Sequence, residues 1–506
     1  DVLGSRGLGD VYKRQRLDYP DPDVIRVEDT YYMVSTTMHF MPGCEILQSF
    51  DLVHWEHVTY VYETLDHTDA QQLKSGQNIY GQGMWAASLR YHEGRFCICF
   101  VANDTRKTYL YTSEKIDGPW KKQLIEGFYH DGSLLFDEDG RNYIVYGNDE
   151  IWITELNEDL TAPKKDGLHR LLVSDHKNPE LGYEGSHIQK INGYYYIFLI
   201  HSLRDRWMRT EACFYSDSLE GEFTGGDVLC DDRGYCGQGV AQGGIVDTPD
   251  GKWYAMLFQD SGAVGRIPIL LPVTWKDHFP FFGQNGHVPE EIEVHSTRPG
   301  YIYQPLVGSD DFCNGLLPRW QFNHDPDPRY YHLDALQGTY TITTREVCTE
   351  LTQAVNTLTQ RMSYPSCAAE VTVDASALKE GDVAGLCALQ SCYAAVGITK
   401  HHGKYEVLML DKKEDGILDM TEGTVVESHQ MDFRLEADFS NMKDEARCYY
   451  RVNKGDWLPI GTVHKLYFKL DHFTGCRVGL FCYAAEETGG SACFRDFKYY
   501  DVDEIS

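Results

Sequence analysis

The sequence predicts an all-β protein, a five-bladed β-propeller followed by a β-sandwich. A strand–turn–strand pattern that recurs five times predicts the propeller, and a run of short alternating segments after the last repeat predicts the sandwich. Aromatic residues make up 13% of the 506 residues, with 34 Tyr among them. That composition suits β-structure better than a helical bundle.

The repeated pattern consists of a short alternating strand, a tight turn and an aromatic-rich strand. It occurs at 24–34, 89–100, 134–146, 188–199 and 245–257. Four copies turn at an acidic residue or Asn near a Gly, which is a strong hairpin signal, and the first copy has Thr30 instead. The turns are 46 to 64 residues apart, room for about four strands each. We therefore predict a propeller over residues 16–305.

After residue 305 the repeats stop, and segments such as TYTITT (339–344) and CRVGLFCYA (476–484) continue with Gly or Asp turns between them. Many short strands of this kind predict a β-sandwich over residues 306–506. Residues 1–15 contain DVYKRQ, which reads like translated sequencing-adapter DNA. We treat this segment as a scar and leave it out of the fold prediction.

Charge and cysteine usage narrow the function classes. Asp and Glu total 77 against 46 Lys and Arg, a net charge of −31, which predicts no nucleic-acid or membrane partner. The chain has no run of about 18 apolar residues, as a spanning helix would need. Fifteen Cys without CxxC or zinc spacing predict buried reduced thiols and a cytoplasmic location. Secretion stays open, because a signal peptide can be missing together with the native start.

One position in each repeat is a candidate for a functional residue. Nine residues before the five turns the chain has, in order, Asp21, Trp85, Asp131, Glu184 and Gln242. The innermost strands of a propeller line a central channel, so these five positions should converge. Three carboxylic acids in one place repel each other unless one is protonated or a cation is near. Their shared offset therefore predicts a functional trio rather than unrelated turn residues.

Three carboxylates and an indole suit the hydrolysis of a glycosidic bond. An inverting enzyme needs an acid for the leaving oxygen and a base for water, held about 6.5–9.5 Å apart. A third carboxylate near the acid can raise its pKa and keep it protonated. The indole of Trp85 offers a flat apolar face for a sugar ring.

These residues lie in motifs that resemble glycoside hydrolase family 43, the five-bladed propeller β-xylosidases and α-L-arabinofuranosidases. The similar stretches include DYPDPDV (18–24), GMWAASLRYHEGRF (83–96), HDGSLLFDEDG (130–140), YEGSHIQKINGYYYIF (183–198) and GRIPIL (265–270). The segments 310–333, 358–374 and 473–500 are similar to the concanavalin-like domain that follows many of its β-xylosidases, which implies a jelly-roll arrangement for the sandwich.

The resemblance implies roles for the trio. Asp21 is the implied general base, Glu184 the implied general acid, and Asp131 the residue that modulates the pKa of the acid and orients it. Arg266 matches the Arg that contacts substrate and carboxylates. An Arg there would favour ionised carboxylates and offset the crowding of negative charge.

Other implied substrate-binding positions are less defined. Met38, His39 and Phe40 stand where family members wall the pocket for the terminal sugar, and spacing leaves open whether they pack inside the blade instead. His187, near Glu184, either hydrogen-bonds within the site or is a satisfied channel histidine.

Gln242 stands where many members have a His that binds a channel water or calcium. Because an amide is not a typical metal ligand, we predict no catalytic metal and no required cofactor. A structural calcium in the sandwich stays open.

The sequence therefore predicts an inverting, exo-acting β-xylosidase that acts on xylo-oligosaccharide or arabinoxylan fragments. An α-L-arabinofuranosidase is the alternative, because xylopyranose and arabinofuranose present similar hydroxyls. A non-catalytic carbohydrate-binding propeller should lack one of the carboxylates. A retaining fructosidase of the invertase type should carry an Asn-Asp-Pro-Asn-like motif where this chain has Tyr19-Pro20-Asp21-Pro22. The sandwich is expected to serve packing or homo-oligomer formation, with a pocket wall or a weak sugar-binding face as the other interpretations.

Overall fold

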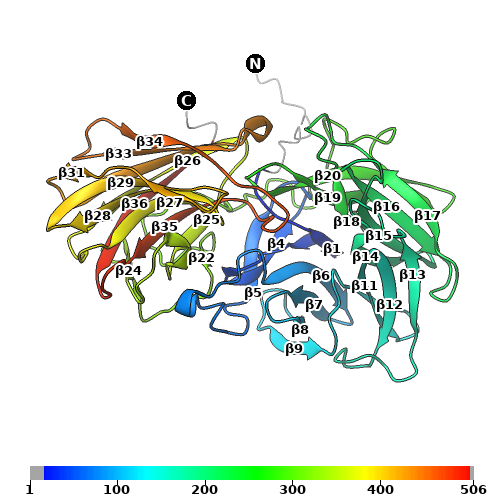
Figure 1. Cartoon of the computed structure of the whole chain (residues 1–506). Helices are drawn as coiled ribbons and strands as arrows, with labels where there is room; N and C mark the ends of the chain where they lie inside the picture. Colours follow the sequence, from blue (N-terminus) through cyan, green and yellow to red (C-terminus); the bar gives the residue numbers. More distant parts are fainter. Residues whose placement is uncertain (1–15, 502–506) are drawn as a thin grey trace, which may run out of the picture.

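The computed structural model describes residues 16–501 and consists of β-strands with three short 3-10 turns. Figure 1 shows two lobes, one built from the blue-to-green strands and one from the yellow-to-red strands. The predicted all-β class, with a propeller followed by a sandwich, is confirmed. The predicted scar at 1–15 lies outside the described residues. No helix among residues 16–501 is long and apolar enough to span a membrane.

The first lobe is a propeller of five four-stranded antiparallel sheets, in which each blade follows chain order. Blade 1 contains β1 (Asp23–Val27), β2 (Thr30–Val34), β4 (Gly43–Ser49) and β5 (Glu56–Tyr62); blade 2 contains β6 (Met84–His92), β7 (Arg95–Ala102), β8 (Lys107–Ser113) and β9 (Lys121–Ile125). Blade 3 contains β10 (Ser133–Phe136), β11 (Asn142–Asn148), β12 (Glu150–Leu156) and β13 (His169–Ser174). Blade 4 contains β14 (Glu184–Ile191), β15 (Tyr194–Ser202), β16 (Arg209–Ser216) and β17 (Thr224–Leu229). Blade 5 contains β18 (Ala241–Asp247), β19 (Trp253–Asp260), β20 (Arg266–Lys276) and β21 (Phe279–Phe282).

The turns of the repeat have the backbone that their residues favour. Gly94, Gly140, Gly193 and Gly251 all have positive φ, between 78° and 85°, which glycine adopts without strain. In blade 1 the register is one residue different from the predicted one. Val27 pairs with Thr30, so the turn is formed by residues 28 and 29 and Thr30 already begins β2.

The first strands of the blades, β1, β6, β10, β14 and β18, contact one another in a closed ring around the axis. Three of them carry an irregular register near their start, where Ala86, Gly185 and Gln242 have positive φ. A β-bulge of this kind turns a side chain out of the regular alternation. Asp21 and Asp131 also have positive φ just before their strands. This local backbone directs the predicted site residues into the channel.

The second lobe is a sandwich of a nine-stranded and a seven-stranded sheet around one large apolar core. The first sheet comprises β3 (Phe40–Met41), β22 (Gln321–Asn323), β25 (Leu358–Arg361), β35 (Arg477–Tyr483), β27 (Val383–Leu389), β28 (Tyr393–His401), β29 (Lys404–Lys412), β30 (Leu418–Met420) and β31 (Thr424–Val426). The second comprises β23 (Tyr331–Asp334), β24 (Thr339–Thr343), β36 (Ser491–Asp501), β26 (Ser366–Asp374), β32 (Gln430–Asp438), β33 (Glu445–Arg451) and β34 (Leu458–Lys465). The 3-10 turns are η1 (Lys74–Gly76), η2 (Leu351–Gln353) and η3 (Ser440–Met442).

The two lobes are joined by a strand, by a buried ion pair and by packed imidazole rings. β3 comes from the propeller sequence but pairs with β22 of the sandwich. Arg361 of β25 reaches Glu45 of blade 1 at 2.8 Å, and both side chains are buried. A buried cluster of three imidazoles, His39, His324 and His472, lies at the same interface, with ring centroids 4.7 Å (His39–His324) and 5.3 Å (His39–His472) apart.

The fifteen cysteines are all free thiols, and eleven of them are buried. Most therefore act as small apolar side chains in the two cores.

Candidate active site

The five residues that lie nine positions before the repeat turns come together in the structure. A cavity of about 110 Å³ lies at one end of the channel and takes one of them from each blade. The lining residues are Asp21, Trp85, His130, Asp131, Leu181, Glu184, Arg209, Gln242, Arg266, Leu470 and Phe473. The geometry thus groups three carboxylates, two guanidinium groups, an imidazole and an indole in a space suited to a single sugar ring.

Asp21 is held by two donors on different oxygens. Arg266 Nη1 donates to Oδ1 at 2.6 Å, and the Thr36 hydroxyl donates to Oδ2 at 2.5 Å. Arg266 Nε also donates to Asp260 at 3.2 Å, which fixes the guanidinium in place. The predicted contact of Arg266 with a carboxylate is therefore present, and it involves Asp21.

Asp131 and Glu184 lie next to each other, with His130 beside both. Asp131 Oδ2 accepts the backbone N–H of Gly185 at 2.9 Å, so it holds the chain immediately after Glu184. His130 Nε2 lies 3.5 Å from Asp131 Oδ2 and 3.3 Å from Glu184 Oε2. Asn148 Nδ2 donates to the same Glu184 oxygen at 2.7 Å.

The electrostatics differ from the predicted balance. Burial, followed by the charges of Glu184 and Asp21, raises the pKa of Asp131 to about 6. Burial also favours the neutral form of Glu184, but the hydrogen bond and charge of His130, together with the charges of the two arginines, outweigh it and lower the pKa of Glu184. The expectation had the pKa of the acid raised by its neighbour. His130, which that reasoning did not include, supplies the positive charge that reverses the balance.

The same group has the donor atoms that a divalent cation accepts. The ligand atoms of His130, Asp131 and Glu184 lie within 4.8 Å of one another. Imidazole and carboxylate suit several transition metals. The expectation that the protein needs no metal remains a prediction.

The other predicted substrate-binding residues divide into two groups. Trp85 lines the cavity, and its indole Nε1 is buried without a hydrogen-bond partner in residues 16–501. Gln242 also lines the cavity, and its backbone N–H donates to the buried Glu211 at 2.7 Å.

Met38, Phe40 and His187 do not line this cavity. Met38 and Phe40 are buried between the lobes, because β3 pairs with the sandwich; the guanidinium of Arg477 lies 3.9 Å from the Phe40 ring centroid. The structure therefore places them in the interface and not in the predicted pocket wall. His187 lies deeper in the channel, where its Nδ1 is 3.1 Å from Asp23 Oδ1, as a satisfied channel histidine would be.

The sandwich completes the cavity, which sequence reasoning could only offer as one interpretation. The segment between β34 and β35 reaches the propeller, where Gly475 N–H donates to Asp18 at 2.7 Å (Figure 1). It brings Phe473 against Trp85, with centroids 5.1 Å apart, and over the Arg266 guanidinium at 3.9 Å. Leu470, 48% exposed, lies at the rim.

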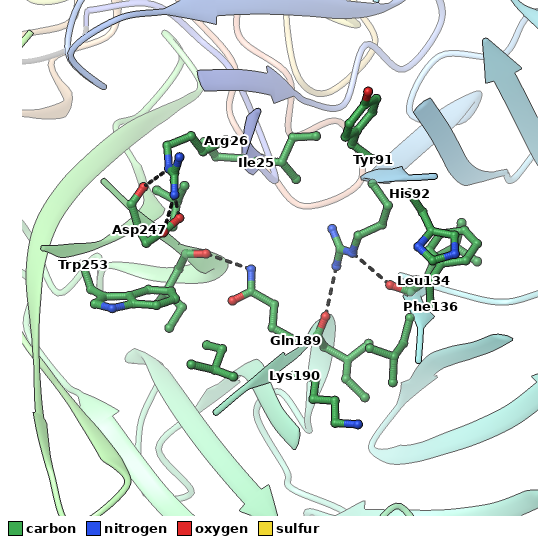
Figure 2. Close-up of a pocket in the computed structure, with 17 residues that line it drawn as sticks. Ile25, Arg26, Tyr91, His92, Leu134, Phe136, Gln189, Lys190, Asp247 and Trp253 are labelled. Atoms are coloured by element: carbon green, nitrogen blue, oxygen red, sulfur yellow. Dashed lines mark hydrogen bonds and ion pairs between the residues drawn. The ribbon is translucent and has the colours of Figure 1, made fainter. Parts of the chain in front are cut away.

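A larger cavity of about 410 Å³ lies further along the same five inner strands, at the other end of the channel (Figure 2). Polar groups that line this cavity are already paired or hydrogen-bonded with one another. Arg26 pairs with Asp247, Arg90 donates to Leu134 O, and Gln189 donates to Ile245 O. The reactive carboxylates are all at the smaller cavity, so the candidate active site is there.

Comparison with known proteins agrees with this geometry. Residues 15–280 match the model of glycosyl hydrolases family 43, and residues 309–500 match the beta xylosidase C-terminal concanavalin A-like domain. A beta-xylosidase of Formosa agariphila is 26% identical, over 96% of this chain and 88% of its own length. A xylosidase/arabinosidase of Butyrivibrio fibrisolvens is 23% identical, over 96% and 98%.

Among solved structures, the bifunctional GH43-CE protein of Bacteroides eggerthii is 41% identical with a TM-score of 0.90. The match covers 98% of this chain, which spans 64% of the length of that protein. The family model covers more than half of the sequence, in the lobe that holds the three carboxylates. The chain therefore belongs to glycosyl hydrolases family 43 and is a glycosidase of the β-xylosidase or arabinofuranosidase type.

Proposed function

We propose that this protein is an inverting, exo-acting β-xylosidase that releases xylose from the non-reducing end of xylo-oligosaccharides. The observation that carries the proposal is the convergence of Asp21, Asp131 and Glu184 on one cavity of about 110 Å³. The small size of this cavity supports a reaction on one terminal pentose rather than on the interior of a chain.

In the proposed reaction Glu184 transfers a proton to the glycosidic oxygen as the bond between that oxygen and C1 breaks. A water molecule attacks C1 from the opposite face, and its proton passes to Asp21. Arg266 positions Asp21 for this step, because its Nη1 donates a hydrogen bond to Asp21 Oδ1. Asp131 positions the acid through the Gly185 N–H.

The aromatic walls of the cavity strengthen the electrostatic interactions of these groups, because they keep water away. Trp85 and Phe473 pack against each other beside the carboxylates, so water has little access to that side of the sugar. General acid and base groups in such sites each contribute roughly 10²- to 10⁴-fold to the rate.

An α-L-arabinofuranosidase is the second candidate, because curated relatives are named for both activities. Comparing kcat/KM for aryl β-xyloside and aryl α-L-arabinofuranoside decides between them. A higher value for the xyloside supports the proposal, and a strong preference for the arabinofuranoside overturns it in favour of the second candidate.

Two further measurements test the mechanism. Proton NMR of the first sugar anomer released should show inversion, and retention would contradict Asp21 as a base. Glu184→Ala should lose turnover and keep sugar binding. Unaltered turnover would refute the acid assignment, and a wild-type protein that binds xylo-oligosaccharides without cleaving any glycoside would support a binding propeller.

A further inference from the structure

The two oxygens of the Glu184 carboxyl group have different surroundings. Oε2 receives Asn148 Nδ2 at 2.7 Å and lies 3.3 Å from His130 Nε2. Oε1 has no hydrogen-bond partner among residues 16–501. Since Glu184 lines the cavity, Oε1 is the oxygen left for substrate.

Both groups at Oε2 donate a hydrogen. The Asn148 amide nitrogen can only donate. His130 Nε2 faces two carboxylate oxygens, of Asp131 and Glu184, so the ring carries a hydrogen at Nε2 in either charge state. Asp131 Oδ2 in turn holds the Gly185 N–H, which limits movement of the chain next to the acid.

A neutral carboxylic acid carries its hydrogen on one oxygen and accepts at the other. A hydrogen on Oε2 would point at two donors, and each of those hydrogen bonds would be lost. A hydrogen on Oε1 keeps both donors paired with the carbonyl-like Oε2. The arrangement therefore prefers one of the two positions of the acid hydrogen.

We propose that Asn148 and His130 form a two-donor clamp on Glu184 Oε2, which fixes the catalytic hydrogen on Oε1, facing the glycosidic oxygen. Asn148 ends β11 and His130 precedes β10, so blade 3 supplies the clamp for an acid that begins β14 in blade 4. Both are positioning residues that act through Glu184. The inference rests on the proposed general-acid role of Glu184.

The test compares a substrate that needs the acid with one that does not. The disaccharide of xylose has a sugar leaving group that must be protonated. The 2,4-dinitrophenyl β-xyloside has a leaving group that departs as a stable anion. Asn148→Ala and His130→Phe should lower kcat on the disaccharide roughly 10- to 100-fold, with KM nearly unchanged. The same variants should lose less than about threefold on the dinitrophenyl substrate.

Two controls keep the result specific. His130→Gln retains an N–H donor and should recover most of the disaccharide activity. Asn142→Ala, at the opposite end of β11, should resemble wild type on both substrates. Asn148→Ala serves as the primary variant, because Asn148 is exposed and its loss does not open the core.

Equal losses on the two substrates, a loss confined to KM, or losses no larger than that of Asn142→Ala would overturn the clamp. Assays of the wild-type protein distinguish a failure of the clamp from a failure of the proposed substrate assignment. A preference for arabinofuranosides overturns only the β-xylosidase proposal, and the clamp is then measured with the arabinofuranoside pair. A wild type without glycosidase activity overturns both.

Discussion

The buried imidazoles at the lobe interface should make the docking of the two lobes sensitive to acid, and His472 is the residue through which to measure it. Its ring is fully buried next to His39, and its neighbour in sequence, Phe473, walls the active site. Burial lowers the pKa of His472 to about 4. Burial and the charge of His472 lower the pKa of His324 to about 3. The rings are therefore neutral in the folded protein.

The size of the effect follows from that pKa. An unfolded histidine has a pKa of about 6.5, so the unfolded chain binds a proton between about pH 6.5 and 4 and the folded ring does not. The stabilisation is complete above the unfolded pKa and is lost as the pH falls. Between about pH 7.5 and pH 5, His472 alone should account for roughly 2 kcal/mol of lost free energy of unfolding.

The substitution His472→Phe keeps an aromatic ring and removes the titration. It also removes the hydrogen bond between His472 Nδ1 and the Ser391 hydroxyl, at 2.8 Å, a cost of about 1 kcal/mol. That cost is present at both pH values and cancels in their difference. Urea unfolding followed by tryptophan fluorescence at about pH 7.5 and pH 5 gives the comparison. The variant should lose roughly 2 kcal/mol less than wild type on acidification. Equal losses in the two proteins would refute the reasoning.

Three further predictions use other contacts. Phe473→Ala should lower kcat/KM by about 10- to 100-fold in an aryl glycoside assay, because Trp85 and Arg266 lose the ring that orders them. A twofold change or less would contradict a role for the sandwich in the pocket. Arg361→Met removes the guanidinium from the buried Glu45, which keeps only its contact with His57 at 3.0 Å, and should cost about 3–5 kcal/mol in urea unfolding. The double variant with Glu45→Gln should recover part of this, and additive losses would argue against the pair. Dialysis against EDTA should leave kcat unchanged, and a loss that added metal restores would show that His130, Asp131 and Glu184 hold a required ion.

The blades were predictable because their turns are set by local chemistry. An Asp or Asn with Gly between alternating strands specifies the hairpin within a few residues, and strands of fixed length then give the inner side chains one offset from each turn. The offset identified Trp85 and Glu184 correctly as neighbours in space, although they are 99 positions apart in the chain. The difference at Thr30 shows the limit of this approach, because a bulge adds a residue in some blades and not in others.

The residues that were missed are those whose neighbours come from another part of the chain. Phe473 reaches the pocket only through the packing of the sandwich on the propeller, which no local spacing records. His130 is adjacent to Asp131 in sequence, and its imidazole next to a predicted catalytic carboxylate was a signal that could have been used. The family resemblance suggested Phe40 for the pocket wall and left packing inside the blade open, and the pairing of β3 with β22 places it in the interface instead.

That two-residue strand bears on how the molecule can be divided. A propeller expressed without its companion would expose the unpaired edge of β3 and the buried Phe40, and would lose one wall of its reaction chamber. In domain exchanges among enzymes of this kind, the propeller and the sandwich should therefore be transferred together as one unit. They should not be separated at the linker or at the edge that β3 shares with β22.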